Sequence, residues 1–358
     1  MTITLDGTTG ITTPTTSTTG EFVTSVTGFK NRIINGAMVI DQRNAGASGT
    51  ATSFPVDRWS FAASLTTKGT WQQNAGSVTP PVGFANYLGF TSNSAYAISA
   101  TDYFTFQQRI EGFNFYDLAF GTANAATVTL SFRVYSSLTG TFGGSFSNGA
   151  GTRSYPFTYT ISSANTWTQI SVTIAGDTGG TWIGATNGNA AAITFSLGTG
   201  TTYSGTAGAW SSNLYLSATG ATSVVGTNGA TFYITGVQLE KGSTATSFDY
   251  RSYGTELALC QRYYQATGNV SVSAYSTTGV IGFILPVTMR AAPTVTFSYA
   301  GTTNNTYRID TGAQQTLTSP TVINTNNSIN SMYAFTPAAW AGTPGIGFNI
   351  SWFLSAEL

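Results

Sequence analysis

Few side chains in this sequence could perform acid–base or nucleophilic chemistry, and they lie far apart. There are 13 acidic residues and no histidine, so the commonest general base and metal ligand is missing. Hydrolysis of a glycosidic bond needs two carboxyl groups flanking that bond, roughly 5 to 9.5 Å apart. No two acids form a recognisable motif for this reaction, although folding or assembly could bring distant acids together. The single cysteine, Cys260, belongs to an apolar helical pattern, which favours a buried, inert thiol. We therefore expect no catalytic residues and no enzyme activity.

Two short clusters combine acidic and basic side chains. Asp57-Arg58-Trp59 is either a ligand-facing trio or a local ion pair beside a core indole, and the ion pair is the commoner arrangement. Arg109 and Glu111 are two residues apart on an expected strand. Their side chains should therefore lie on one face of the sheet, where we expect them to form an ion pair.

Aromatic and amide side chains near the end of the chain suit the recognition of a neutral sugar. Sugars offer apolar C–H faces that stack on aromatic rings, and hydroxyl groups that bond to amides. The candidate ligand-binding residues are Trp340, Tyr333, Tyr307, Asn304, Asn305, Asn326 and Asn327, with the asparagines expected in loops. Trp340 lies among prolines and small residues, so few local neighbours can cover its ring. It either contacts a ligand or packs across a subunit interface, and both interpretations stay open.

The composition excludes several classes of function. Only 7% of residues are charged, and 13 basic residues balance 13 acidic ones, so nothing favours binding of nucleic acid through its phosphates. No apolar run approaches the roughly 18 residues of a membrane-spanning helix, and the first residues lack the pattern of a secretion signal. We expect the protein to stay where it is made, or to leave inside a larger particle.

Most of the chain is expected to form β-strands, because apolar and polar residues alternate in many short runs. The runs are 104–111, 128–135, 167–174, 192–197 and 233–239, then 280–285, 294–299 and 346–354. Residues 30–40 resemble a strand pair with a turn at Asn35-Gly36. These patterns predict a mainly β protein, with an antiparallel jelly-roll sandwich over residues 30–250 and a smaller β-sandwich over residues 266–358.

One helix, over residues 254–265, is expected to link the two sandwiches within a segment 251–265. Its apolar residues recur every three or four positions and form a wide face. A helix of this length is marginal alone and must pack against something. We predict that this face contributes to a homotrimer interface comprising Leu257, Leu259, Cys260, Tyr263 and Tyr264.

Residues 1–29 are rich in Thr and Gly and have too few apolar residues to form a core. They form either a disordered terminus or an extended arm for attachment or trimerisation, which orders against other chains of an assembly.

Several segments together resemble tail-fibre and receptor-binding proteins of tailed bacteriophages. They are residues 5–12, 31–36, 57–59, 108–112, 236–240, 251–254, 256–264 and 285–293, in the same order as in those proteins. The resemblance implies a central domain similar to carbohydrate-binding jelly rolls, a trimeric fibre and a location in the virion, as a tail appendage made in the host cytoplasm. Related sandwich modules in enzymes often hold a structural calcium ion. Gly236 stands where those modules commonly have an aspartate, so the sequence departs from their calcium pattern, and we expect no other cofactor.

The predicted function is that of a structural and receptor-binding subunit of a phage tail fibre, which adheres to a glycan on the host surface. The arm would dock on other tail or baseplate proteins, and the domain 266–358 would meet the cell. One alternative is a purely architectural part of the virion, such as a baseplate-attached fibre or a capsid or neck decoration, that binds no sugar. A second alternative is a glycan depolymerase.

Overall fold

The chain divides into two compact units, residues 1–30 and 31–358. The computed structural model describes residues 4–6, 10–12, 30–266, 270–273, 285–299, 302–303, 305–308, 314–316, 320–324, 333–337 and 347–358. In the first unit β1 (Thr4–Asp6) pairs with β2 (Gly10–Thr12). No helix in the described ranges is long and apolar enough to cross a membrane.

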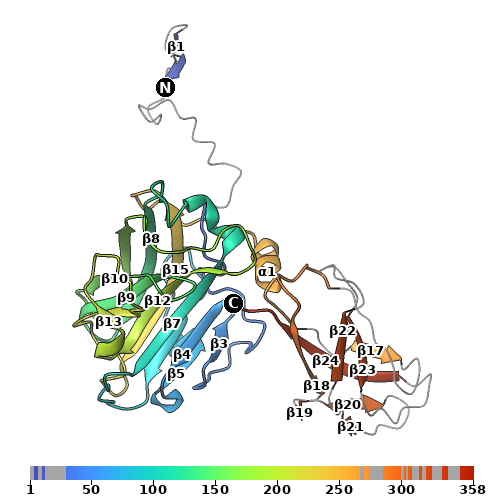
Figure 1. Ribbon diagram of the computed structural model, residues 1–358. Helices are drawn as coiled ribbons and strands as arrows, with labels where there is room; N and C mark the ends of the chain where they lie inside the picture. The colour runs from blue at the N-terminus through green and yellow to red at the C-terminus, as the bar shows by residue number, and fades with distance from the viewer. Residues whose placement is uncertain are drawn as a thin grey trace. The chain divides into compact units, whose positions relative to one another are not determined.

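Two antiparallel sheets form the central sandwich of the second unit (Figure 1). The six-stranded sheet has the order β10 (Ser154–Ile161), β9 (Gly140–Asn148), β12 (Asn189–Thr199), β7 (Tyr103–Glu111), β4 (Trp59–Ala63) and β3 (Ser53–Val56). The five-stranded sheet has the order β11 (Thr168–Ile174), β8 (Val128–Ser136), β15 (Thr231–Lys241), β6 (Leu88–Ser92) and β5 (Gly69–Gln73). The five strands predicted before the helix are confirmed, within a few residues at each end.

The core lies between the two sheets, and alternation along each strand determines which residues enter it. On β7, Phe104 and Phe106 are fully buried, as are Phe132 on β8 and Phe195 on β12. The rings of Phe132 and Phe195 meet edge to face, with centroids 4.9 Å apart. The residues between Phe104 and Phe106 and beyond them point to the opposite side of the six-stranded sheet, where the candidate site lies.

Short elements connect the strands. They are η1 (Thr66–Lys68), η2 (Ala75–Ser77), η3 (Gly112–Asn114), η4 (Tyr116–Leu118) and η5 (Thr201–Tyr203), which are single 3-10 turns, and the strand pair β13 (Ser204–Gly205) and β14 (Ser217–Ala218). The β13–β14 pair is parallel, but it joins only two residues of each strand.

Residues 30–40 do not form the predicted strand pair. Asn35 has a positive φ of 57°, and its side-chain oxygen accepts bonds of 2.8 and 3.0 Å from the main-chain N–H groups four and five residues ahead. The Gln108 side chain bonds both the N–H and the carbonyl of Ile34 at 2.8 Å. These side-chain bonds take the place of a hairpin ladder, so the segment lies against the sandwich as ordered loop. Gly36 is required there, because a Cβ would lie 2.1 Å from the carbonyl oxygen of Val237.

The helix α1 (Tyr253–Gln261) is shorter than predicted. Residues 264–265, expected in the helix, belong to β16 (Tyr264–Ala266), which pairs with β24 (Gly347–Ser355). Pairing with a strand almost a hundred positions ahead overrides the local helical pattern, and this partner cannot be seen from the helix sequence itself.

The apolar stripe of this segment packs on the chain itself. Cys260 and Tyr263 are fully buried in a cluster with Ile34 and Ile40, and burial raises the pKa of the Cys260 thiol well above its ordinary value. Tyr264 is also buried, whereas Leu257 and Leu259 are half-buried. The chain's own residues therefore cover Cys260, Tyr263 and Tyr264, and the subunit interface stays a prediction.

The strands after the helix form a seven-stranded sheet and a two-stranded one. They comprise β16, β17 (Val270–Ser273), β18 (Thr294–Tyr299), β19 (Thr302–Thr303), β20 (Asn305–Arg308), β21 (Gln314–Thr316) and β24, with β22 (Pro320–Asn324) paired to β23 (Tyr333–Pro337). The strands predicted over 294–299 and 346–354 are confirmed, and most of the run 280–285 lies outside the described residues.

The cluster Asp57-Arg58-Trp59 is buried, and its charges pair with distant residues. Arg58 binds the carboxylate of Glu357, which also accepts a bond of 2.9 Å from Arg43. Nη1 of Arg43 lies 3.6 Å from Oδ1 of Asp57. The predicted core indole is confirmed, since Trp59 is fully buried. The predicted local ion pair is wrong, because the partner of Arg58 lies 299 residues along the chain.

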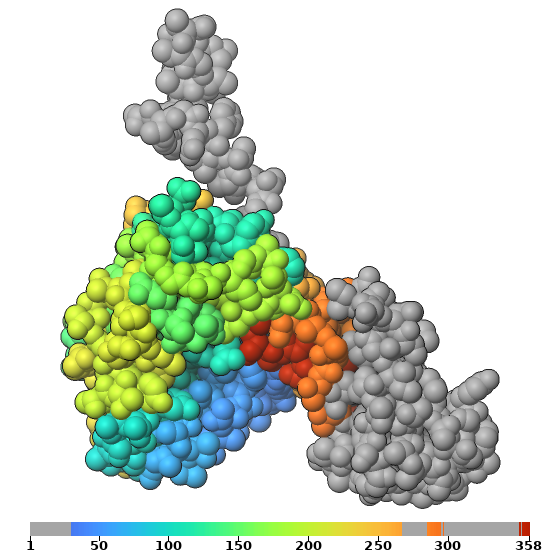
Figure 2. Space-filling model, in the orientation of Figure 1, coloured from blue at the N-terminus to red at the C-terminus, as the bar shows by residue number. Residues whose placement is uncertain are grey.

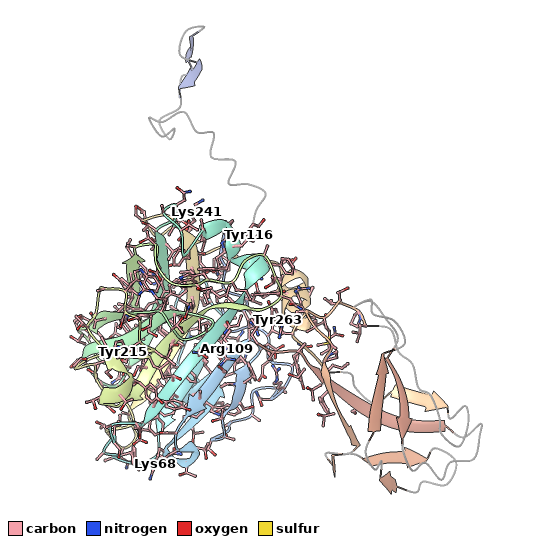
Figure 3. The ribbon with its side chains drawn as sticks, in the orientation of Figure 1. Lys68, Arg109, Tyr116, Tyr215, Lys241 and Tyr263 are labelled. Carbon is pink, nitrogen blue, oxygen red and sulfur yellow. The ribbon has the colours of Figure 1, made fainter. Side chains whose placement is uncertain are left out.

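Arg109 and Glu111 do not form the predicted pair either. Nη1 of Arg109 donates a bond of 2.7 Å to the main-chain oxygen of Leu358. Glu111 accepts bonds of 2.6 and 3.1 Å from Arg262 and one of 2.7 Å from the hydroxyl of Tyr263, which is labelled in Figure 3. The segment after the helix supplies a better partner for Glu111 than its neighbour on the strand.

Asp57 should make the stability of the fold depend on pH. Burial raises the pKa of Asp57 from its ordinary 3.8 to about 6, against the opposing effects of Arg43 and Gln42. The folded state binds the proton of the Asp57 carboxyl group more tightly than the unfolded state does. The stability that this proton provides is therefore fully present below pH 3.8 and is lost as the pH rises through about 6. That contribution is on the order of 3 kcal/mol.

Urea unfolding at pH 4.5 and 7 measures this contribution in the parent and in Asp57→Asn, whose amide does not titrate. The free energy of unfolding should decrease more between pH 4.5 and pH 7 in the parent than in Asp57→Asn. An identical pH dependence in both proteins would contradict the argument, because all other acids are shared.

Candidate functional site

A groove lies on the outer side of the six-stranded sheet, opposite the core. It holds a cavity of about 350 Å³. Tyr103, Thr105, Gln107 and Arg109 line it from β7, at the positions that alternate with Phe104 and Phe106. The remaining lining residues are Ala62, Ser147, Asn148, Gly149, Ala150, Gly151, Asn189, Ala192, Tyr203, Leu214 and Leu216. Strand alternation therefore places a polar and aromatic row in the groove.

One wall of the groove comes from the segment between β12 and β15. Residues 200–219 fold back over β9, β10 and β12, where Ser211 and Ser154 exchange main-chain bonds of 2.8 and 3.0 Å. Figure 2 shows this segment, in yellow-green, on the same face of the molecule as β3 and β4, in blue. The wall brings Tyr203, Leu214 and Leu216 to the groove.

A second cavity, of about 240 Å³, adjoins the first. Ala62, Gln107 and Arg109 line both cavities. The second cavity extends over β4 and β3 to Phe54, and Leu358 lines it as well. The two cavities together form an open depression over β12, β7, β4 and β3.

Two tyrosines provide the aromatic surface of the groove. Tyr103 and Tyr203 meet edge to face, with ring centroids 5.6 Å apart and planes at 84°. Both are half-buried, so part of each ring is accessible. Each tyrosine supports the orientation of the other, which fixes a ring on which an apolar sugar face can stack.

Amides and a guanidinium group provide the polar contacts. Gln107 donates a bond of 3.1 Å to the Thr194 hydroxyl, and its oxygen accepts one of 3.3 Å from Nε of Arg109. Asn189 donates a bond of 3.1 Å to the carbonyl of Gly149. Because their neighbours already orient these side chains, their remaining donors and acceptors are held in fixed directions in the groove.

The described residues that line the groove carry few charges. Arg109 and Arg58 are the charged residues that line the two cavities, and Arg58 is paired with Glu357. None of the residues that line either cavity is an aspartate or a glutamate. A glycosidase mechanism requires two carboxyl groups at the bond that is cleaved, so the side chains lining this groove cannot supply it.

The candidate residues of the C-terminal domain are not brought into the described site. Trp340, Asn304, Asn326 and Asn327 lie outside the described residues. Asn305 and Tyr307 belong to β20 and Tyr333 to β23, so Asn305 lies in a strand and not in a loop. Their role in ligand binding stays a prediction.

Strand alternation in the sequence already indicates the groove, which was not among the predicted sites. In the run 103–109 the residues that alternate with the core phenylalanines are Tyr, Thr, Gln and Arg. A solvated strand face usually carries small or charged residues, and an aromatic ring and an amide on one such face suit a sugar. The wall over this face could not be predicted, since residues 200–219 have no regular pattern.

The position of the calcium ion in related modules was tested at Gly236. Gly236 has a φ of +62°, and a Cβ there would lie 2.6 Å from the ring of Phe84. The carbonyl oxygen of the next residue, Val237, accepts a bond of 3.1 Å from the Asn31 amide. The described residues contain no group of three or more His, Cys, Asp or Glu side chains that could hold a metal ion. Whether a structural calcium ion binds here stays a prediction.

Comparisons with known proteins give distant structural similarities. No family model matches the sequence, and no curated protein is detectably similar to it. The enzymatically active domain of tailspike protein 4 of bacteriophage CBA120 is 13% identical, with a TM-score of 0.33, and the match covers 60% of this chain and 22% of that chain. A putative sugar binding protein from Bacteroides thetaiotaomicron is 11% identical, with a TM-score of 0.34, over 59% of this chain and 100% of that one. A family 11 carbohydrate-binding module of a cellulosomal cellulase of Clostridium thermocellum is 12% identical, with a TM-score of 0.28, and the match covers 57% of this chain and 100% of that one.

Proposed function

We propose that this protein binds a glycan in the groove on its six-stranded sheet and does not cleave it. The observation that carries the proposal is the Tyr103–Tyr203 pair, which lies beside Gln107 and Asn189 in a cavity of about 350 Å³ with no carboxylate in its lining. Rings stack on the C–H faces of a sugar, and amides bond to its hydroxyl groups. A largely uncharged lining favours a neutral glycan over a charged one.

The wider setting that we propose is a tail fibre of a bacteriophage, in which this chain is a structural and receptor-binding subunit. The sequence segments 31–36 and 251–264 support this setting through their resemblance to such proteins. The fibre would be a homotrimer whose arms, residues 1–29, attach to tail or baseplate proteins of the virion. Three grooves on one trimer would raise the avidity for a repetitive cell-surface glycan without new contacts.

A glycan array with product analysis tests binding and cleavage together. We expect the purified protein to retain a subset of neutral glycans, and to release no reducing ends from any of them. Released reducing ends would overturn the non-enzymatic part of the proposal. Failure to bind any glycan of the array or any polysaccharide extracted from susceptible cells would favour a purely architectural part of the virion.

A further inference from the structure

An apolar surface surrounds a third cavity, which shares no lining residue with the groove. This cavity, of about 240 Å³, lies between Gly83–Ala85, residues 36–39 and residues 248–256. Large side chains are exposed around it. Tyr250 is 58% exposed, Tyr253 is 63% exposed, and Val82, next to Gly83, is 98% exposed. Exposed apolar residues gathered at one place mark surfaces of interaction. We call Val82, Phe84, Tyr250 and Tyr253 the rim surface.

The rim surface is preorganised. The ring of Phe84 lies 5.1 Å from that of Phe248 and 5.5 Å from that of Tyr250, between centroids, and Phe248 and Tyr250 are 4.8 Å apart. Tyr253 is the first residue of the helix α1, which fixes the position of its main chain. A partner would therefore meet an ordered set of rings, and little conformational entropy would be lost on binding.

The charges around this cavity are used within the chain. Arg251 lies 3.3 Å from the carboxylate of Glu256, which also accepts a bond from the main-chain N–H of Asn35. Asp249 accepts a bond of 3.3 Å from the main-chain N–H of Asn31. The rim surface consequently presents rings and aliphatic groups without a charge that would repel its equivalents in copies arranged around a threefold axis.

We propose that the rim surface joins copies of this chain. The inference depends on the proposed homotrimer and names its contact surface, in place of the buried helix stripe. Asn31, near the start of the second compact unit, lines the cavity, and residues 1–30 precede it. Association here brings the starting points of the arms together, as attachment of one fibre to one site requires. Tyrosine is also among the residues that contribute most to interfaces.

Two substitutions test the rim surface without disturbing the fold. Val82→Asp changes a fully accessible side chain, and Tyr253→Ser removes a ring that makes no ring–ring contact in the described part of the chain. The matched control is Phe113→Ser with Tyr116→Ser, at residues that are 51% and 55% exposed and do not line this cavity. Figure 3 labels Tyr116. Sedimentation velocity over a range of concentrations gives the mass, and circular dichroism checks the fold.

The parent and the control variant should sediment as trimers with the same midpoint of dissociation. Each rim variant should be folded and should dissociate at concentrations at least about tenfold higher than the parent. A parent that is monomeric at micromolar concentration would overturn both the trimer and its surface. If both rim variants dissociate at the same midpoint as the parent trimer, the trimer is supported but the rim surface is not its contact. The same rejection follows if the rim variants stay trimeric but lose glycans on the array, since the occupant would then be a sugar.

Discussion

Replacing Glu111 with alanine is expected to lower the free energy of unfolding by about 3–5 kcal/mol, the typical effect of removing one partner of a buried ion pair. The Glu111 side chain is fully buried, and it accepts bonds from Arg262 and from the Tyr263 hydroxyl. Without the carboxylate, the Tyr263 hydroxyl would lose its partner in a buried position, and the guanidinium of Arg262, whose side chain is 29% exposed, would lose the acceptor of its two hydrogen bonds. The contact between the helix segment and β7 should weaken with them.

A surface ion pair provides the control for this prediction. Asp117 lies 2.7 Å from Arg32, and its side chain is 40% exposed. Exposed pairs contribute about 0–1 kcal/mol, so Asp117→Asn should change stability by no more than that. Urea unfolding followed by fluorescence measures both variants. Equal and small effects of Glu111→Ala and Asp117→Asn would show that Glu111 does not hold the segment after the helix to the sandwich.

Replacing Trp59 with alanine is expected to cost about 3–5 kcal/mol, as for other buried aromatic residues replaced by alanine. The indole is fully buried, and its ring lies 6.1 Å from that of Phe195. Its Nε1 donates a bond of 3.1 Å to the main-chain oxygen of Asn35. Trp59 therefore fills the core and also ties the loop 30–40 to the sandwich.

Trp59→Phe separates these two roles. Phenylalanine keeps most of the apolar volume but cannot donate a hydrogen bond, and an unpaired buried acceptor costs about 1–3 kcal/mol. The loss in Trp59→Phe should thus be smaller than in Trp59→Ala. Thermal unfolding of the two variants measures the difference, and a Trp59→Phe protein as unstable as Trp59→Ala would contradict the packing role.

Strands of the sandwich were predictable because the evidence for them is local. On β8, β11 and β12 one face enters the core and the other does not. Apolar residues therefore recur at every second position of these strands. The fully buried rings of Phe132 and Phe195 lie at positions that this period predicts. The core could therefore be assigned before any tertiary contact was known.

Contacts between distant residues account for what the sequence did not predict. The partner of Arg58 is Glu357, and the partner of Glu111 is Arg262, 151 residues ahead. The loop 30–40 was predicted to be a hairpin because it contains an Asn-Gly pair. It is not one, because the bonds that hold it come from the side chains of Asn35 and Gln108. The groove escaped prediction for the same reason, since its wall, residues 200–219, takes its position from β9 and β12 and not from its own sequence.

The central claim is that a glycan binds against the tyrosine pair, and isothermal titration of the best glycan from the array tests it most directly. The titration compares the parent with Tyr103→Ala, Tyr203→Ala and, as a control away from the groove, Phe113→Ala. Removal of a stacking ring at the centre of an interface typically costs more than 1 kcal/mol. We therefore expect each tyrosine variant to bind at least about fivefold more weakly, with an unchanged melting temperature of the trimer, and the Phe113 variant to bind like the parent. Parent-like affinity in both tyrosine variants would contradict binding in the groove.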